Sequence, residues 1–285
     1  MASFDFDQAE GLRRMLAGPK PRVVTFLSST PSDDKGAMLV NLGASLARAG
    51  NDVLIVDATV RDYGVARRLE MERHAGLLQV ARQECALNQV VQSAPQGFSV
   101  ALLSRDGSLP GAGSDEARRL AKTFDVLVQG QGGIVIVDGE LARDGSLALP
   151  ALADSEIVVQ VSTSATSITN AYALIKRLAQ EFGRRPFGIL VTGASEAEAR
   201  VVYANMSAAA SRYLAVTLNS MGSVPADEYL HRAARLGRAV VDAFPLAGAS
   251  VAFRALAGRV AMARMGKLER NSGFERQSGG AHFGS

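Results

Sequence analysis

The folded part of the chain begins with an apolar run, a polar loop, an amphipathic stretch and a second apolar run. Val23–Leu27 is rich in β-branched and aromatic residues, which is typical of a buried strand. The stretch after the loop repeats apolar residues at helical spacing, and Gly50 and Asn51 then stop the helix. Val53–Val56 is a second buried strand, and it ends on Asp57. The pattern predicts the first βαβ unit of a parallel sheet.

The same alternation of apolar runs and helical patterns continues along the chain. Further strands are predicted at residues 98–103, 133–138, 157–161, 187–191 and 222–225. Short helices are predicted at residues 65–69 and 77–81, and another begins near residue 87. A further helix is predicted from residue 114 or 115 to about 123, and longer ones at 166–182, 196–214, 229–236 and 251–265. We see no linker between two cores and no internal repeat. We therefore expect one α/β domain over residues 21–265, in which helices flank a mostly parallel twisted sheet in three layers.

The two ends of the chain have a different pattern. In residues 1–20, Asp7 can cap a short helix that places Ala9, Leu12 and Leu16 on one face. A helix of this length is marginal in water, so we expect it to dock on the core or to order in the groove of a partner. A frayed terminal helix is the simpler alternative. Residues 266–285 are polar and rich in Gly and Ser, which predicts a disordered tail.

Composition narrows the class of protein. The chain has 285 residues, of which 47% are hydrophobic, so it can bury a sizeable core. It has no Trp, and its net charge is only +3, with acidic and basic residues interspersed. These features argue against a nucleic-acid surface. The helix at 251–265 has few bulky apolar residues, so we expect it to dock on the core, with at most weak or indirect membrane contact.

Cysteine and histidine usage excludes two further classes of site. The single Cys85 cannot form an internal disulfide, and its helical context indicates a small buried hydrophobe. The three histidines lie far apart, so no metal site is expected. We find neither a signal peptide nor a long apolar run, and we therefore expect a cytoplasmic protein.

The loop after the first strand is the candidate site of chemistry. In P-loop proteins this loop is rich in glycine, and its N–H groups wrap a phosphate. Here Pro31 has no N–H, and Asp33 and Asp34 bring carboxylates to the place of a polyphosphate. Each such contact repels by roughly 1–4 kcal/mol at 4 Å. We expect a βα loop without tight nucleotide binding, in which Lys35 is the one remaining cation.

Asp57 and Asp138 each follow a buried strand directly. The carboxyl ends of parallel strands form the edge where α/β sheets hold ligands. In working P-loop enzymes such carboxylates hold magnesium or its waters. Turns also favour Asp after a strand, so a structural role stays open for both residues. Lys35, Asp57 and Asp138 together are the candidate remnant of a nucleotide and magnesium site.

Three segments resemble one known family. The segment STSATSITNAYALIKRL (162–178) closely resembles a helix of the MinD/ParA-type ATPases, in particular the flagellar-number regulators called FlhG, FleN or YlxH. The segment GSVPADEYLHRAARLGRAVVDAFPLAGASVAFRALA (222–257) is similar to the closing segment of these proteins, and DQAEGLR (7–13) resembles their N-terminal activator helix. The likeness extends over nearly the whole chain and implies a P-loop NTPase fold of the MinD type.

The family binds ATP at a deviant P-loop, KGGxGKT, and dimerises around two nucleotides. Carried onto this chain, the signature lysine falls on Thr30, the glycines on Pro31, Ser32 and Asp34, the phosphate lysine on Lys35, and the magnesium threonine on Gly36. Asp57 and Asp138 match the family, whereas the switch carboxylate falls on Thr59, and Thr192 and Gly193 stand where an adenine-side Asn is expected. The resemblance therefore implies a degenerate phosphate loop and a pseudo-ATPase. No cofactor is expected, and Mg-ATP would bind only if the site is still competent.

The resemblance also implies a partner. The matched activator residues are Asp7, Gln8, Ala9, Leu12 and Arg13, and they would contact an FlhF-type GTPase of the signal-recognition class. The expected role is control of flagellar number or placement, with recruitment to the cell pole or flagellar base. Two alternatives stay open. One is an active ATP hydrolase that switches by forming a homodimer on ATP, and the other is a scaffold that dimerises without nucleotide.

Overall fold

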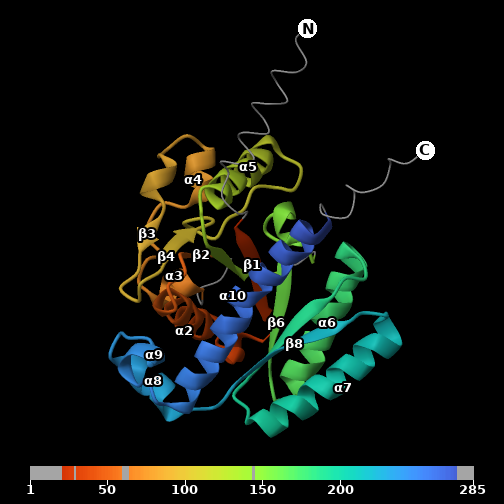
Figure 1. Cartoon of the computed structure of the whole chain (residues 1–285). Coiled ribbons are helices and arrows are strands. Elements are labelled where there is room, and N and C mark those ends of the chain that lie inside the picture. Colours follow the sequence, from red (N-terminus) through yellow and green to blue (C-terminus); the bar gives the residue numbers. More distant parts are fainter. Residues whose placement is uncertain (1–20, 29, 60–63, 143–144, 275–285) are drawn as a thin grey trace, which may run out of the picture.

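The computed structural model describes residues 21–28, 30–59, 64–142 and 145–274, which form one eight-stranded sheet with helices on both faces (Figure 1). From edge to edge the strands are β3 (Gln92–Ser93), β4 (Ser99–Leu102), β2 (Val53–Ala58), β5 (Ile134–Gly139), β1 (Arg22–Ser28), β6 (Glu156–Ser162), β7 (Phe187–Thr192) and β8 (Leu218–Val224). All neighbours pair in parallel except β3 and β4, which are antiparallel. The predicted three-layer, mostly parallel fold is confirmed.

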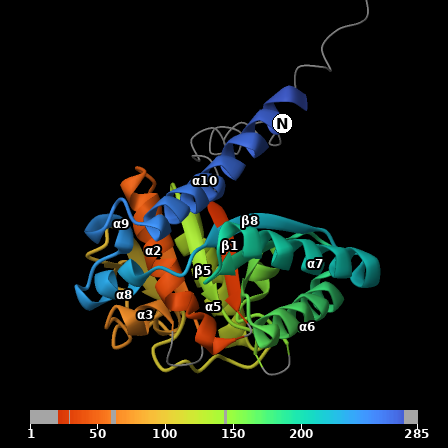
Figure 2. The same cartoon turned by 90° about the horizontal axis from the view of Figure 1, so that it is seen from below.

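Helices divide between the two faces of the sheet. The helical elements are η1 (Pro31–Asp33), α2 (Lys35–Arg48), α3 (Val65–Arg68), α4 (Leu77–Ala81), η2 (Leu87–Gln89), α5 (Asp115–Gln129), η3 (Pro150–Asp154), α6 (Ala165–Phe182), α7 (Glu196–Leu214), α8 (Glu228–Arg235), α9 (Val240–Ala243) and α10 (Gly248–Phe274). One apolar core lies under α2, α3, α8, α9 and α10, and a second lies under α4, α5, α6 and α7 (Figure 2). Every residue of β2 and β5 is buried, as the continuous apolar runs predict.

Serine caps fix the start of several helices. Ser164 Oγ accepts the N–H of Ser167 at 3.1 Å and so begins α6. Ser195 and Glu198 form a reciprocal capping box at the start of α7. These caps satisfy N–H groups that the first helical turn leaves without an internal partner.

Several element bounds differ from the sequence-based expectation. Helix α10 continues to Phe274, beyond the predicted end at Met265. Residues 267–270 favour helix, and each of the two glycines, Gly266 and Gly273, costs only about 1 kcal/mol. The short elements β3 and α9 were not predicted, since neither is long enough to show a period. The predicted amino-terminal helix and residues 275–285 lie outside the described residues.

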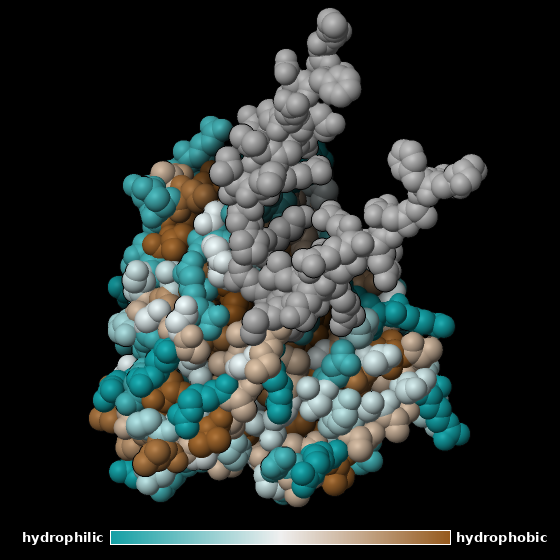
Figure 3. All heavy atoms as spheres, viewed as in Figure 1, coloured by the Kyte–Doolittle hydropathy of each residue, from teal (hydrophilic) through white to brown (hydrophobic). Residues whose placement is uncertain are grey.

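The surface of the described residues is mixed. Figure 3 shows hydrophilic and hydrophobic residues interspersed over the face that Figure 1 presents. None of the helices within the described ranges is both long and apolar enough to span a bilayer.

Candidate functional site

The loop between β1 and α2 is a compact turn in which the N–H groups of Thr30, Asp33 and Asp34 already have acceptors. The N–H of Asp33 donates to Thr30 O at 3.0 Å, and that of Asp34 donates to Pro31 O at 3.2 Å. Thr30 N donates to Ser28 Oγ at 3.3 Å. A phosphate loop needs these N–H groups to point at the ligand, so this turn would have to open before it could wrap a phosphate.

The side chain and carbonyl of Asp33 tie the turn to the neighbouring strand and helix. Ser167 Oγ in α6 donates to Asp33 Oδ2 at 2.7 Å, and Gln160 Nε2 in β6 donates to Asp33 O. Ser28 Oγ lies 3.4 Å from the same carboxylate oxygen. The carboxylate thus occupies a polar position between β1 and α6 and adds negative charge there.

Asp34 ties the turn to α3. Its φ of 45° lies in the left-handed region, and its carboxylate caps α2 by accepting Ala37 N at 3.2 Å. Arg68 Nη2 lies 2.6 Å and 2.7 Å from the two carboxylate oxygens of Asp34. Both side chains are exposed, so we expect this ion pair to contribute less than about 1 kcal/mol.

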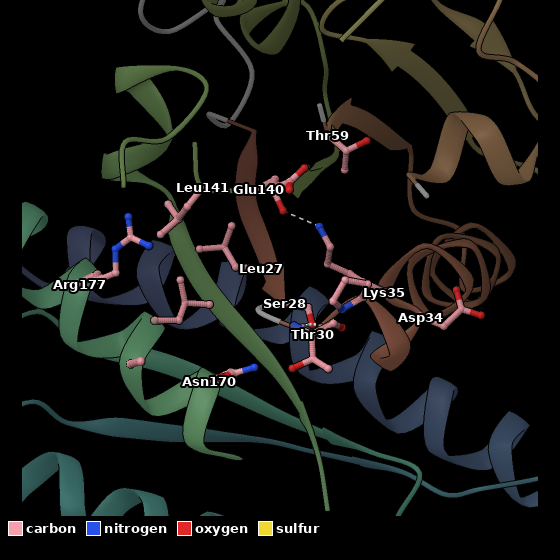
Figure 4. Close-up of a pocket in the computed structure, with 14 residues that line it drawn as sticks. Leu27, Ser28, Thr30, Asp34, Lys35, Thr59, Glu140, Leu141, Asn170 and Arg177 are labelled. Carbon is pink, nitrogen blue, oxygen red and sulfur yellow. Dashed lines mark hydrogen bonds between the residues drawn. The ribbon is translucent and has the colours of Figure 1, made fainter. Parts of the chain in front are cut away.

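Lys35 is neutralised inside the protein. Its Nζ forms an ion pair with Asp138 and lies 3.5 Å from Phe26 O. It also donates to Gly139 O (Figure 4). The Lys35 side chain is 11% exposed and that of Asp138 is 0% exposed. A phosphate would have to compete with a buried carboxylate for this cation.

Asp57 and Asp138 anchor the first turn of α3. Val65 N donates to Asp138 Oδ2 at 2.9 Å, and Ala66 N donates to Asp57 Oδ2 at 2.7 Å. Thr59 donates to Asp57 Oδ1 through its N–H at 3.0 Å and its hydroxyl at 2.6 Å. Burial and the nearby Asp138 charge raise the pKa of Asp57 to about 6, although these hydrogen bonds oppose the shift.

Gly64 permits the close approach of α3 to these carboxylates. A Cβ on Gly64 would lie 2.3 Å from Asp57 Oδ2 and 2.4 Å from Thr59 Oγ1. Only glycine therefore fits between the helix and Asp57 without a shift. The arrangement directs both strand-end carboxylates at backbone N–H groups of α3, where a magnesium site would need their lone pairs.

Two cavities lie on either side of the loop. One, of about 400 Å³, lies against α6 and is lined by polar groups of Lys35, Thr59, Glu140, Asn170 and Arg177 (Figure 4). The other, of about 800 Å³, lies between α2 and α8 and reaches Thr192 and Gly193. Gln160 and Gln96 line it, and in the described part of the chain their buried Oε1 atoms accept no hydrogen bond. These two amides could meet donors of a bound molecule.

The structure brings Lys35, Asp57 and Asp138 together at the carboxyl end of the sheet. Across the described ranges, no group of three or more His, Cys, Asp or Glu residues could hold a metal ion. The predicted partner-binding residues Asp7, Gln8, Ala9, Leu12 and Arg13 lie outside the described residues.

Sequence reasoning missed three residues that hold the loop, namely Arg68, Gln160 and Ser167. Gln160 gives a signal, because it interrupts an otherwise apolar strand. Arg68 and Ser167 give none, because exposed arginines and helix-start serines are common.

No protein-family model matches the chain. The antiactivator FleN of Pseudomonas aeruginosa is 31% identical over 223 residues, which cover 78% of this chain and 79% of FleN. A chain of the MinC:MinD cell division protein complex from Aquifex aeolicus superposes with a TM-score of 0.63 at 18% identity, over 84% of this chain and 95% of that one. MinD of Pyrococcus horikoshii, complexed with Mg-ADP, gives a TM-score of 0.60 at 15% identity, over 90% and 98%. The solved structures establish the shared fold, and the FleN match establishes the branch: this chain belongs to the FleN-type members of the MinD/ParA family.

Proposed function

We propose that this protein is a FleN-type regulator of flagellar number or placement that works without effective ATPase activity. In this proposal the amino-terminal helix binds and stimulates an FlhF-type GTPase. The relationship to FleN supports the regulatory role, and the DQAEGLR segment supports the partner. Recruitment to the cell pole or flagellar base would follow from the partner's position.

The contacts of Lys35 are the main support for the proposed loss of ATPase activity. An ATPase needs this cation for the phosphates, whereas here Asp138 and two carbonyls hold it. The N–H groups of Asp33 and Asp34 donate within the turn, and the Asp33 carboxylate adds repulsion. Binding a triphosphate would require breaking a largely buried ion pair and unfolding the turn, and few contacts would be left to offset these costs.

Calorimetry with Mg-ATP tests the lost site. We expect no measurable binding by the natural chain at millimolar nucleotide. The triple variant P31G/S32G/D34G restores glycine at the three matched positions and removes one carboxylate, so any residual competence should appear there. An affinity in the micromolar range for the natural chain would refute the proposal.

A GTPase-stimulation assay tests the partner. Deleting residues 1–17 should abolish stimulation of an FlhF-type GTPase. The neighbouring arginines offer a matched pair: R13A should weaken stimulation because Arg13 matches the activator motif, whereas R14A should leave it unchanged. Full stimulation by the deletion variant would contradict the assigned role of the helix.

The second candidate is an ATP-dependent switch. The cavity of about 800 Å³ favours it, since the cavity lies beside the loop and offers two unpartnered amide oxygens. Light scattering with and without Mg-ATP separates the candidates. A dimer formed only with ATP would identify the switch, and a dimer in both conditions would identify a nucleotide-independent scaffold.

A further inference from the structure

A corner on the α2 face carries the exposed side chains of Leu246, Arg232 and Arg254 beside two half-buried aromatic rings, and the candidate site does not use them. It consists of Tyr229 and Arg232 from α8, Phe244 and Leu246 from the turn after α9, and Arg254 from α10, and we call it the Leu246 corner. The rings of Tyr229 and Phe244 lie 4.7 Å apart. Arg232 Cζ lies 5.0 Å from the first ring centroid and 5.3 Å from the second. The guanidinium is therefore held by both rings.

The turn that presents Leu246 is fixed by hydrogen bonds. Phe244 O accepts Ala247 N at 3.0 Å and Ser250 Oγ at 2.8 Å. Arg254 Nη1 donates to the carbonyl of the intervening Pro245 at 2.8 Å. Leu246 is nevertheless 94% exposed. A rigid turn that displays a bare leucine is preorganised for contact, because docking would order few additional groups.

A simpler role for Leu246 is a hydrophobic staple at the start of α10. In that motif the residue before the helix cap packs on a residue in the first turn, which here is Val251. Val251 is 55% exposed, and with Leu246 at 94% the two side chains bury little of each other. The staple therefore does not account for the exposure.

The charge of the corner selects the kind of occupant. Arg232, Arg235 and Arg254 form no ion pair with any described residue, and the nearby Asp242 is already paired with Arg48. Guanidinium groups prefer carboxylates, which they bind through two parallel hydrogen bonds. A bilayer needs more bulky apolar side chains than a leucine and a valine. The corner thus suits a peptide that combines carboxylates with apolar groups.

The chain contains such a peptide at its amino end. Residues 4–10 read FDFDQAE and carry the carboxylates of Asp5, Asp7 and Glu10 beside the rings of Phe4 and Phe6. Their apolar groups match Leu246 and their carboxylates match the arginines. Tethering on one chain raises the effective concentration of this peptide at the corner.

A series of contacts connects the start of β1, which follows the segment in the chain, to the corner. Arg22, which begins β1, donates its N–H to Gly133 O, and the adjacent Ile134 N donates to Asp52 O. Asp52 follows shortly after Arg48, whose ion pair with Asp242 leads to α9. The start of β1 and the corner are therefore linked by contacts along one rim of the sheet. Residues 11–20 can span about 33 Å when extended.

We propose that residues 4–10 dock on the Leu246 corner of their own chain, with residues 11–20 extended, and thereby withhold the activator residues from the GTPase partner. The regulatory consequence rests on the proposed function, whereas the docking itself does not. Docking places a phenyl ring of the segment against Leu246 and aligns its carboxylates with Arg232 and Arg254. Release of the segment would expose the activator residues.

Disulfide trapping in the full chain tests the docking without any partner. The background is C85A, with one new cysteine at Ser3 and a second at Val251, beside the corner. The control pair combines Ser3→Cys with Val201→Cys on α7, a site of similar exposure (60%) on the other face of the sheet. We expect the corner pair to cross-link within one chain at least about tenfold faster than the control pair. Adding L246S or R232E should remove most of that advantage, and so should 1 M salt, which screens exposed charges.

Each other outcome overturns the proposal in a recognisable way. Equal trapping rates for the two pairs would show that the segment does not prefer the corner. A cross-link between chains would assign the corner to a second copy. Equal rates together with Leu246-dependent sedimentation on anionic vesicles would assign it to a lipid surface. If trapping succeeds, L246S should also raise GTPase stimulation, and unchanged stimulation would then count against the proposed function and not against the docking.

Discussion

The ion pair between Lys35 and Asp138 gives the sharpest test of what this site has become. In a nucleotide site, replacing the phosphate lysine removes activity but leaves stability nearly intact. Here Lys35 is largely buried against a fully buried carboxylate. K35M would leave Asp138 without its cation, and the repulsion between the Asp138 and Asp57 carboxylates would no longer be offset. Breaking a buried ion pair by removing one partner costs about 3–5 kcal/mol.

The magnitude can be measured by a double-mutant cycle. We expect K35M and D138N each to lower the free energy of unfolding by about 3 kcal/mol. The double variant should lose about 2 kcal/mol less than the sum, because the second change finds no partner left to disrupt. In urea, with a slope of about 3 kcal/mol/M, each single variant should shift the midpoint by about 1 M.

Circular dichroism is the appropriate assay, because the chain has no tryptophan to report unfolding. K176M is the control, since Lys176 lies exposed on α6 and should change stability by less than about 0.5 kcal/mol. If K35M behaves like K176M, the lysine is free for a ligand and the reasoning about the closed site fails.

Three further predictions concern the same carboxyl edge of the sheet. The raised pKa of Asp57 means that between about pH 4 and 6 the folded state keeps a proton on this carboxyl that the unfolded state has lost. The free energy of unfolding should therefore fall as pH rises through this window. D57N should remove the fall, and urea midpoints at about pH 4.5 and about pH 7.5 will show whether it does. G64A should cost about 1–3 kcal/mol because its methyl would meet Asp57, whereas G258A, with open space around it on α10, should be neutral or stabilising in the same titration. R68A should cost less than about 1 kcal/mol, and a larger loss would show that its exposed pair with Asp34 does more than bridge two surface groups.

The sequence predicts the fold well where elements are long. Strands β2 and β5 are buried on both faces, so each appears in the sequence as a continuous apolar run. Helix α6 is buried on one face only, so its apolar residues recur at helical spacing. Prediction fails where elements are short or depend on neighbours. Strand β8 begins at Leu218, earlier than the predicted start at Gly222, because pairing with β7 extends a segment with exposed polar residues.

The candidate site could be predicted only in part. Parallel strands end at one edge, so the meeting of Asp57 and Asp138 follows from topology. Their engagement by Val65 and Ala66 does not, because it depends on how the first turn of α3 docks, and no local pattern encodes that contact. The hydrogen bond from Gln160 to Asp33 O is likewise a tertiary contact, between a strand and a turn that are far apart in the sequence.

The anchoring of α3 by two strand-end carboxylates bears on how such a regulator is governed in the cell. A relative that cycles between nucleotide states can be turned on and off without changing how much of it there is. Under the proposed function, a site whose carboxylates are held by their own backbone would not switch the protein with nucleotide. The output would then track the number of copies per cell, so control would pass to synthesis and degradation.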